Sequence, residues 1–179
     1  LRTNNSERAA FEAAWMAHAI TDGLTPAHHF PLEQAMAELR GGEGLETRTS
    51  ILKKNLMKGE NGIELIKNNW KFWGAKGMMT THVAFEAGVA SVVSYPRFKD
   101  AIPSDDEILQ VKNHGYREYY LNQVHSVASM KMYDNFSKSG WTTDLAWQTN
   151  HELMPIIIKS VMLGWLASIW KLEAEKSES

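Results

Sequence analysis

The stretch that decides the fold runs from His18 to His28 and reads His-Ala-Ile-Thr-Asp-Gly-Leu-Thr-Pro-Ala-His. Residues four apart lie on one face of a helix, so His18 and Asp22 can reach the same metal ion or pair with each other. Gly23 is typical of a helix C-terminus, and Pro26 favours a tight connection after it. His28 follows this connection and can fold back toward the same cleft. The stretch therefore predicts a helix, a turn and three possible metal ligands.

Helical patterns continue on both sides of this stretch. Asn5 or Ser6 can cap an alanine-rich helix, and Pro31 can open the helix after the turn. Further helices are expected at Leu32–Arg40, around Ser50–Met57, at Ile63–Trp73, at Met78–Tyr95, from Ser104 to about Ser137 with a break at His114–Gly115, and from Thr143 to about Leu172 with a kink at Pro155. No alternating strand pattern of useful length is present. We therefore expect an all-α fold, a multi-helix bundle in which residues 1–179 form a single helical domain.

A second histidine–carboxylate pair lies far downstream. His82 and Glu86 have the same four-residue spacing as His18 and Asp22. Either pair alone is explained by an ion pair within a helix, worth ~0.2–0.5 kcal/mol. Imidazole and carboxylate groups together also suit Zn²⁺ or another first-row divalent ion. The predicted metal ligands are therefore His18, Asp22, His28, His82 and Glu86.

The pattern H-x3-D-x3-P-x-H followed by H-x3-E resembles the metal core of the zinc-dependent phospholipase C and S1/P1 nuclease family. The resemblance covers residues 7–86 and implies an all-α fold of that type, with zinc ions in a cleft that hydrolyses phosphate esters. It implies that His18 and Asp22 belong to a two-metal part, with Asp22 as a bridging catalytic carboxylate. It also implies that His28, His82 and Glu86 bind a further zinc ion. The implied substrate is a phospholipid or a nucleotide.

The chain departs from the family pattern in two places. Residues 29–81 separate the two halves of the motif, a longer segment than the family has. The family's first ligands, an N-terminal amino group, an early histidine and an Asp/His pair, have no counterpart before His18. An N-terminal part is missing from this chain, or the site is reduced, or other residues substitute. The candidates for substitution are His125, Asp134, His151 and Glu152, and His29 is a neighbour or a rim residue.

The same ligands allow a catalytic and a structural interpretation. Divalent ions lower the pKa of bound water to about 7 and neutralise phosphate oxygens during attack, which supports hydrolysis. A closed site without an open coordination position would be structural instead. A non-catalytic helical domain with a structural metal site, or a degenerate family member, is therefore the main alternative. A third interpretation is a partner-binding module that uses the polar segment 43–62.

The composition excludes several other classes of protein. A net charge of −2 at pH 7 gives no electrostatic basis for nucleic-acid binding. The chain has no cysteine, which excludes disulfides and thiolate zinc sites and is compatible with export. It begins with Leu1, as a processed chain or a fragment would. The most apolar segment, Met154–Trp170, contains Lys159 and is shorter than the ~20 apolar residues of a membrane span. We therefore predict a core helix and no transmembrane segment.

The sequence also predicts which tryptophans are buried and which lysines are exposed. Trp15, Trp70, Trp73, Trp147, Trp165 and Trp170 occur at helix-compatible positions and are expected in the core. Trp141 follows Gly140 and is expected to be the exposed tryptophan. Lys53, Lys54 and Lys58 are expected to form a solvated helix face.

Overall fold

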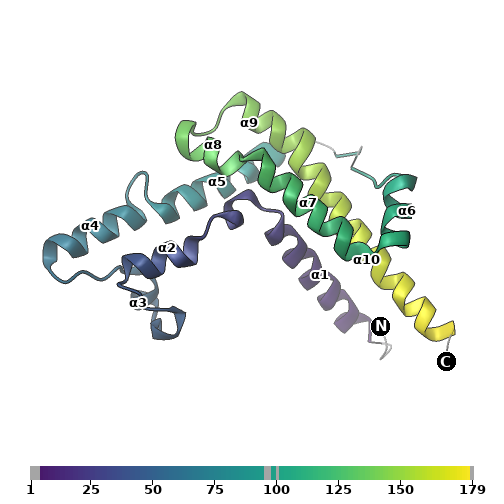
Figure 1. Cartoon of the computed structure of the whole chain (residues 1–179), viewed down its shortest axis with the longest axis horizontal. Helices are drawn as coiled ribbons and strands as arrows, with labels where there is room; N and C mark the ends of the chain where they lie inside the picture. Colours follow the sequence, from purple (N-terminus) through teal and green to yellow (C-terminus); the bar gives the residue numbers. More distant parts are fainter. Residues whose placement is uncertain (1–4, 95–97, 100, 178–179) are drawn as a thin grey trace.

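The computed structural model describes residues 5–94, 98–99 and 101–177, and every regular element in these residues is helical (Figure 1). In chain order the elements are α1 (Ser6–Gly23), the 3-10 helix η1 (Pro26–His29), α2 (Leu32–Leu39), the 3-10 helix η2 (Leu45–Thr47), α3 (Ile51–Asn55), α4 (Gly62–Trp73), α5 (Met78–Val93), α6 (Asp105–His114), α7 (Tyr116–Met130), α8 (Met132–Ser139), α9 (Thr143–Gln148), the π-helix η3 (Thr149–Leu153) and α10 (Met154–Ser177). The all-α prediction is confirmed for the described residues. Tyr95, the predicted end of α5, lies outside them.

Local capping explains where several helices begin. The side chain of Asn5 accepts a hydrogen bond from the backbone N–H of Arg8 at the start of α1. At the start of α6, Ser104 and Glu107 form a capping box, in which each side chain accepts from the other's backbone N–H. Such caps satisfy N–H groups that have no partner within the first helical turn.

The predicted break at His114–Gly115 is confirmed, because α6 ends at His114 and Gly115 has a φ of 89°. The expectation of one helix continuing to Ser137 is wrong. Lys131 has a φ of 51°, a left-handed conformation that interrupts a right-handed helix, and α8 starts after it. The irregularity expected at Pro155 lies just before it, in η3. Proline has no N–H to donate to the carbonyl four residues earlier, which explains a disturbed turn at that point.

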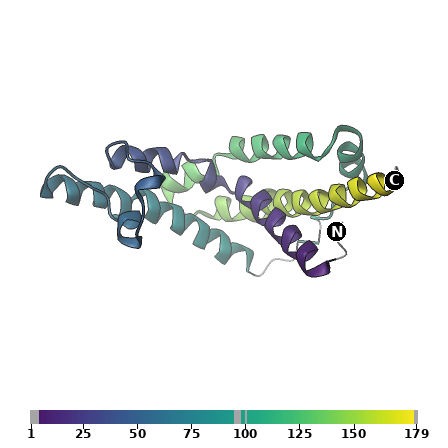
Figure 2. The same ribbon diagram turned by 90° about the horizontal axis from the view of Figure 1, so that it is seen from below.

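The helices form an elongated molecule whose two ends differ (Figures 1 and 2). At one end, α1 and α10 lie side by side, and α7 also packs against α10. At the other end, residues 32–73, which we call the arm, carry α2, α3 and α4 away from these helices. The arm has its own small core of Met36, Met57 and Phe72. The largest core lies between the ends and contains buried side chains from α1, η1, α5, α7, α8, α9, η3 and α10.

Within the described residues, one helical segment is long and apolar enough to cross a membrane by length and composition. It is Thr143–Lys171, with a mean hydropathy of 1.7 over its best window, of which 28 % is buried. The core helix of a soluble protein passes the same test. In this segment Leu153, Ile157 and Leu163 are buried, and α10 packs against α1, α6 and α7. These contacts agree with a core helix on its packed side only, because Met162, Trp165 and Ile169 of the same segment are exposed.

Most of the tryptophan predictions are wrong. Trp15, Trp70, Trp73, Trp147 and Trp165 are exposed, although the indole N–H of Trp73 donates to Asn55 and that of Trp165 donates to Ala13. Trp170 is partly buried against the small core around Leu163. Trp141 was expected to be exposed, but its ring stacks on Phe85 with centroids 5.5 Å apart. A loop position therefore does not prevent a large aromatic ring from filling a gap beside α5.

Candidate metal centre

Two short elements bring three ligand-type side chains together. His82 and Glu86 lie one turn apart on α5, which places both on one face of this helix. His28 comes from η1, which Pro26 opens and which the buried residues Pro26 and Ala27 anchor in the core. The backbone N–H of His28 donates to Thr25, which closes the turn. The chain between these residues runs through α2, α3 and α4 and comes back along α5, so that His28 and His82 lie close together.

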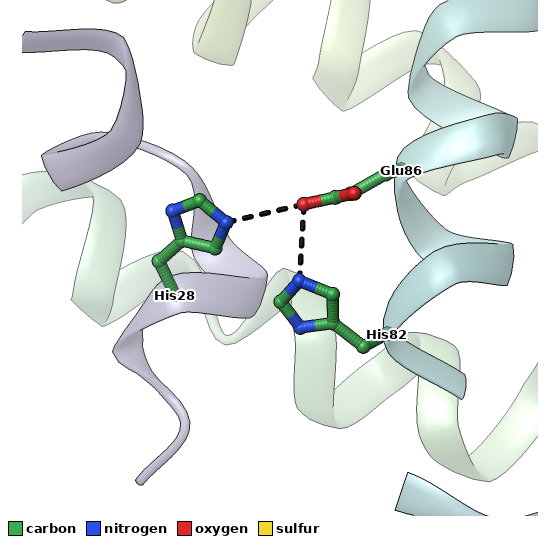
Figure 3. Close-up of side chains that lie close together, drawn as sticks. All are labelled: His28, His82 and Glu86. Carbon is green, nitrogen blue, oxygen red and sulfur yellow. Dashed lines mark hydrogen bonds and ion pairs between the residues drawn. The ribbon is translucent and has the colours of Figure 1, made fainter. Parts of the chain in front are cut away.

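The three side chains meet at one carboxylate oxygen (Figure 3). Glu86 Oε1 lies 3.1 Å from His28 Nε2 and 3.1 Å from His82 Nε2. The two imidazole rings are nearly parallel, with centroids 5.3 Å apart and an interplanar angle of 6°. One ligand atom from each residue lies within 4.8 Å of the others. This is a group of two imidazoles and one carboxylate that could hold a metal ion.

The hydrogen bonds of His28 are compatible with a proton or a metal ion between its Nε2 and Glu86. Its Nδ1 lies 3.1 Å from the backbone oxygen of Asp22, which can only accept, so Nδ1 carries the proton and donates it. In the neutral ring, Nε2 then has a free lone pair directed at the lone pairs of Glu86 Oε1. Such a contact is stable only with a proton or a metal ion between the two atoms. A backbone carbonyl that fixes the tautomer is also the usual outer partner of a metal-binding histidine.

His82 differs from His28 in its surroundings. Its side chain is only 11 % exposed, and its ring packs edge-on against Tyr133. Its Nδ1 is buried and has no hydrogen-bond partner among the described residues. Packing by neighbouring rings therefore fixes the orientation of His82, whereas a hydrogen bond fixes that of His28.

His18 and Asp22 lie on the other side of the His28 ring. Asp22 Oδ1 is 3.8 Å from His28 Nδ1, and Asp22 Oδ2 is 3.1 Å from His18 Nε2. The His18 side chain is 64 % exposed and stacks on Trp15. The five predicted ligands thus form a continuous chain of contacts from His18 to His82. Only His28, His82 and Glu86 converge on one point.

Two tyrosines near the site were not predicted. Burial raises the pKa of Tyr133, and the negative charge of Glu86 adds to this effect. Burial also raises the pKa of Tyr120, and the negative charge of Asp22 adds to it. Both phenols therefore stay protonated near the carboxylates. No spacing in the sequence indicates these contacts, because they depend on how α7 and α8 pack against distant elements.

The other candidate ligands lie outside the group of three. His29 Nε2 is 2.9 Å from the backbone oxygen of Gly23, and His29 lines a separate cavity with Asp134. His151 stacks on Trp147, and Glu152 accepts a hydrogen bond from Gln148. In the described part of the chain, neither these residues nor His125 belong to a cluster of three or more ligand-type groups.

An open cavity lies beside His28, His82 and Glu86, which we call the triad, and it gives the two histidines access to solvent. It has a volume of about 470 Å³, and His28 and His82 line it together with Phe30, Leu32 and Glu33. A small ligand can therefore approach the two imidazoles from the side of η1 and α2. Searches among protein-family models, curated proteins and solved structures find no match to this chain.

Proposed function

We propose that this protein is a metal-dependent hydrolase of phosphate esters of the zinc phospholipase C type. The observation that carries the proposal is the convergence of His28 Nε2 and His82 Nε2 on Glu86 Oε1 beside an open cavity. Two histidines and one carboxylate leave a coordination position open, as in catalytic zinc sites. A metal ion bound there supplies an acidified water and a positive charge next to the phosphate oxygens.

Each residue of the proposed site has a separate task. His28 and His82 present unprotonated nitrogens, and Glu86 supplies negative charge between them. The backbone carbonyl of Asp22 holds the proton of His28 on Nδ1. The carboxylate of Asp22 is the proposed catalytic carboxylate, because it lies beside His28 and is free to face a second ion or a water. His18 orients this carboxylate through the contact between Nε2 and Oδ2.

Metal analysis and hydrolysis together test the proposal. Protein purified without added metal, and the same protein after dialysis against zinc, is examined by elemental analysis and with bis(p-nitrophenyl) phosphate. We expect stoichiometric metal and turnover that a chelator abolishes and zinc restores. Asp22→Asn is expected to lower turnover while the metal content stays the same. If no divalent metal is bound stoichiometrically after dialysis against zinc, the proposal is wrong.

A structural metal site is the second candidate. It is favoured by the position of His18 and Asp22, which among the described residues are not part of the group of His28, His82 and Glu86 that could hold a metal ion. A metal on His28, His82 and Glu86 would then tie η1 to α5 without catalysis. This alternative predicts that chelation lowers the melting temperature while phosphodiesters and phosphomonoesters are not hydrolysed.

A further inference from the structure

Arg40 buries a guanidinium group in the arm with too few partners. The residue is 6 % exposed, and its Nη2 donates to the backbone oxygen of Lys54. Among the described residues, Nε and Nη1 of Arg40 have no hydrogen-bond partner, and neither has Nε of Arg48. A buried cationic donor without an acceptor is costly, so a ligand that supplies acceptor oxygens would be bound favourably.

The charges around Arg40 also favour an anion. Burial and the positive charge of Arg48 lower the pKa of Arg40, while the negative charge of Glu43 acts in the opposite direction. Glu43 is already paired with Lys58. The carboxylate that acts on Arg40 is therefore already used by another cation.

A groove opens beside these groups. Its volume is about 210 Å³, and it is lined by Arg40, Glu43, Thr47, Leu52, Lys53, Leu56 and Lys58. The cationic groups suit a phosphate, and the leucine side chains suit an apolar body attached to it. This combination matches a phospholipid better than a free phosphate ion.

The outer surface of the arm is apolar as well. Ile63, Ile66, Trp70 and Trp73 follow one another on one face of α4 and form an exposed row, which we call the α4 stripe. Ile63 is 81 % exposed and Trp70 is 70 % exposed. The indole N–H of Trp73 donates to the backbone oxygen of Asn55 at 2.7 Å, which places α3 next to the stripe. On α3, Ile51 and Leu52 are also exposed.

Charge decides which partner fits this apolar surface. The arm as a whole contains seven lysines and arginines and six glutamates, and its positive charge is concentrated in its second half. Residues 51–73 contain five lysines and two glutamates, and Lys76 follows them, whereas the whole chain has a net charge of −2. Lys54, Lys67, Lys71 and Lys76 are exposed and have no ion pair with another described residue. Lys67 lies on the same face as Ile63 and Trp70, so two copies that paired through the stripe would repel each other there. An anionic bilayer is complementary to both the lysines and the apolar side chains.

We propose that the arm docks on an anionic phospholipid surface. The α4 stripe, with Ile51 and Leu52, enters the boundary between head groups and acyl chains, and tryptophan is well suited to that depth. The groove at Arg40 holds a head-group phosphate. The docking does not require the metal centre, because the residues that carry it are not among the proposed metal ligands His28, His82 and Glu86.

Vesicle sedimentation tests the proposal with the full chain. We expect binding to vesicles of equimolar phosphatidylcholine and phosphatidylserine, much weaker binding to phosphatidylcholine alone, and a decrease with added salt. Trp70→Ser should lower the partition coefficient about tenfold, because a large apolar side chain no longer enters the membrane. Lys67→Gln and Lys71→Gln should each lower it about fivefold. Arg40→Gln should lower it too, and Lys53→Gln reports on the same groove if Arg40→Gln does not fold.

Two matched variants separate docking from other effects. Trp147→Ser removes an exposed tryptophan outside the arm, and we expect it to bind vesicles like the unmodified protein. His82→Ala removes a proposed metal ligand and should also bind vesicles normally, so the docking and the hydrolase proposal can fail separately. Equal binding to both vesicle types would overturn the proposal, as would a stable dimer in solution that Trp70→Ser dissociates.

Discussion

The two histidine–carboxylate pairs of this protein are alike in sequence and in local geometry, but they differ in their surroundings. In both pairs, the histidine Nε2 lies 3.1 Å from the carboxylate one helical turn away. His18 is exposed on α1, whereas the ring of His82 is partly buried against Tyr133 and shares Glu86 with His28. The four-residue spacing alone therefore gives a histidine–carboxylate pair. A candidate metal site also needs a third side chain from another element.

Removal of His82 should have the largest effect on zinc binding. His82→Ala deletes one of three ligands, so we expect zinc affinity to fall by more than the ~10–100-fold that loss of an outer partner typically costs. Isothermal titration with zinc measures the change. His125→Ala removes an exposed histidine of α7 and serves as the control. Equal affinities of the two variants would show that the triad is not the zinc site.

Gly88→Ala tests how α5, the helix that carries His82 and Glu86, is held in place. A Cβ at Gly88 would lie 1.7 Å from Trp141 Nε1, so the indole ring would have to leave its position on Phe85. We expect the free energy of unfolding to fall by about 1–3 kcal/mol, as is usual for overpacking. Urea unfolding measures it. Ala90→Ser changes an exposed position of the same helix and should have little effect.

A third ion pair, Glu107 and Lys159, connects two helices, whereas the first two pairs each lie within one helix. It joins α6 to α10 at 2.9 Å. Burial acts to raise the pKa of Glu107, but hydrogen bonds from Ser104 and Lys159 outweigh it and hold this pKa below its ordinary value. Because the folded state releases this proton more readily, the pair contributes stability above the pKa of an unfolded glutamate, near 4.3, and loses it as the pH falls through the folded value.

Glu107→Gln should therefore lower stability by about 1 kcal/mol at neutral pH, the scale of a partly exposed ion pair. The deficit should shrink as the pH falls below ~4, since the unmodified protein then loses the same interaction. Thermal unfolding at several pH values checks this. A deficit that stays constant down to low pH would mean that the Glu107 charge is not the cause.

The smallest effect is expected at the exposed pair. His18→Ala removes one ion pair within α1, worth ~0.2–0.5 kcal/mol. Zinc affinity at the triad should not change, because His18 contacts Asp22 and not the converging atoms. A large loss of zinc affinity in this variant would show that both pairs belong to one metal site.

Local chemistry made much of the fold predictable. The cap at Asn5, the capping box at Ser104 and the break at Gly115 follow from the residue types at those positions. The interruption at Lys131 could not be predicted, because nothing in its side chain requires a left-handed conformation. The tryptophan predictions failed because helical spacing identifies one face of a helix and does not tell whether another element covers it.

The candidate site was predictable only as a list of residues. The spacing indicated both pairs, and the pattern around Pro26 indicated His28. The convergence of His28 with His82 depends on how η1 packs against α5, which is a long-range contact. The roles of Arg40 and Arg48 were missed entirely. Neither residue belongs to a motif, and only the structure shows that Nε and Nη1 of Arg40 and Nε of Arg48 are buried without a partner among the described residues.

The contact between α1 and α10 has a consequence for the order of events during synthesis. The indole N–H of Trp165 on α10 donates to the backbone oxygen of Ala13 on α1, across 152 positions of the chain. α1 therefore leaves the ribosome long before the helix that it packs against. A nascent chain that ends after α5 already contains His18, Asp22, His28, His82 and Glu86. It still lacks α10, the helix against which α1 packs. A zinc ion that bound at that stage would therefore bind ligands whose helices are not yet held in place.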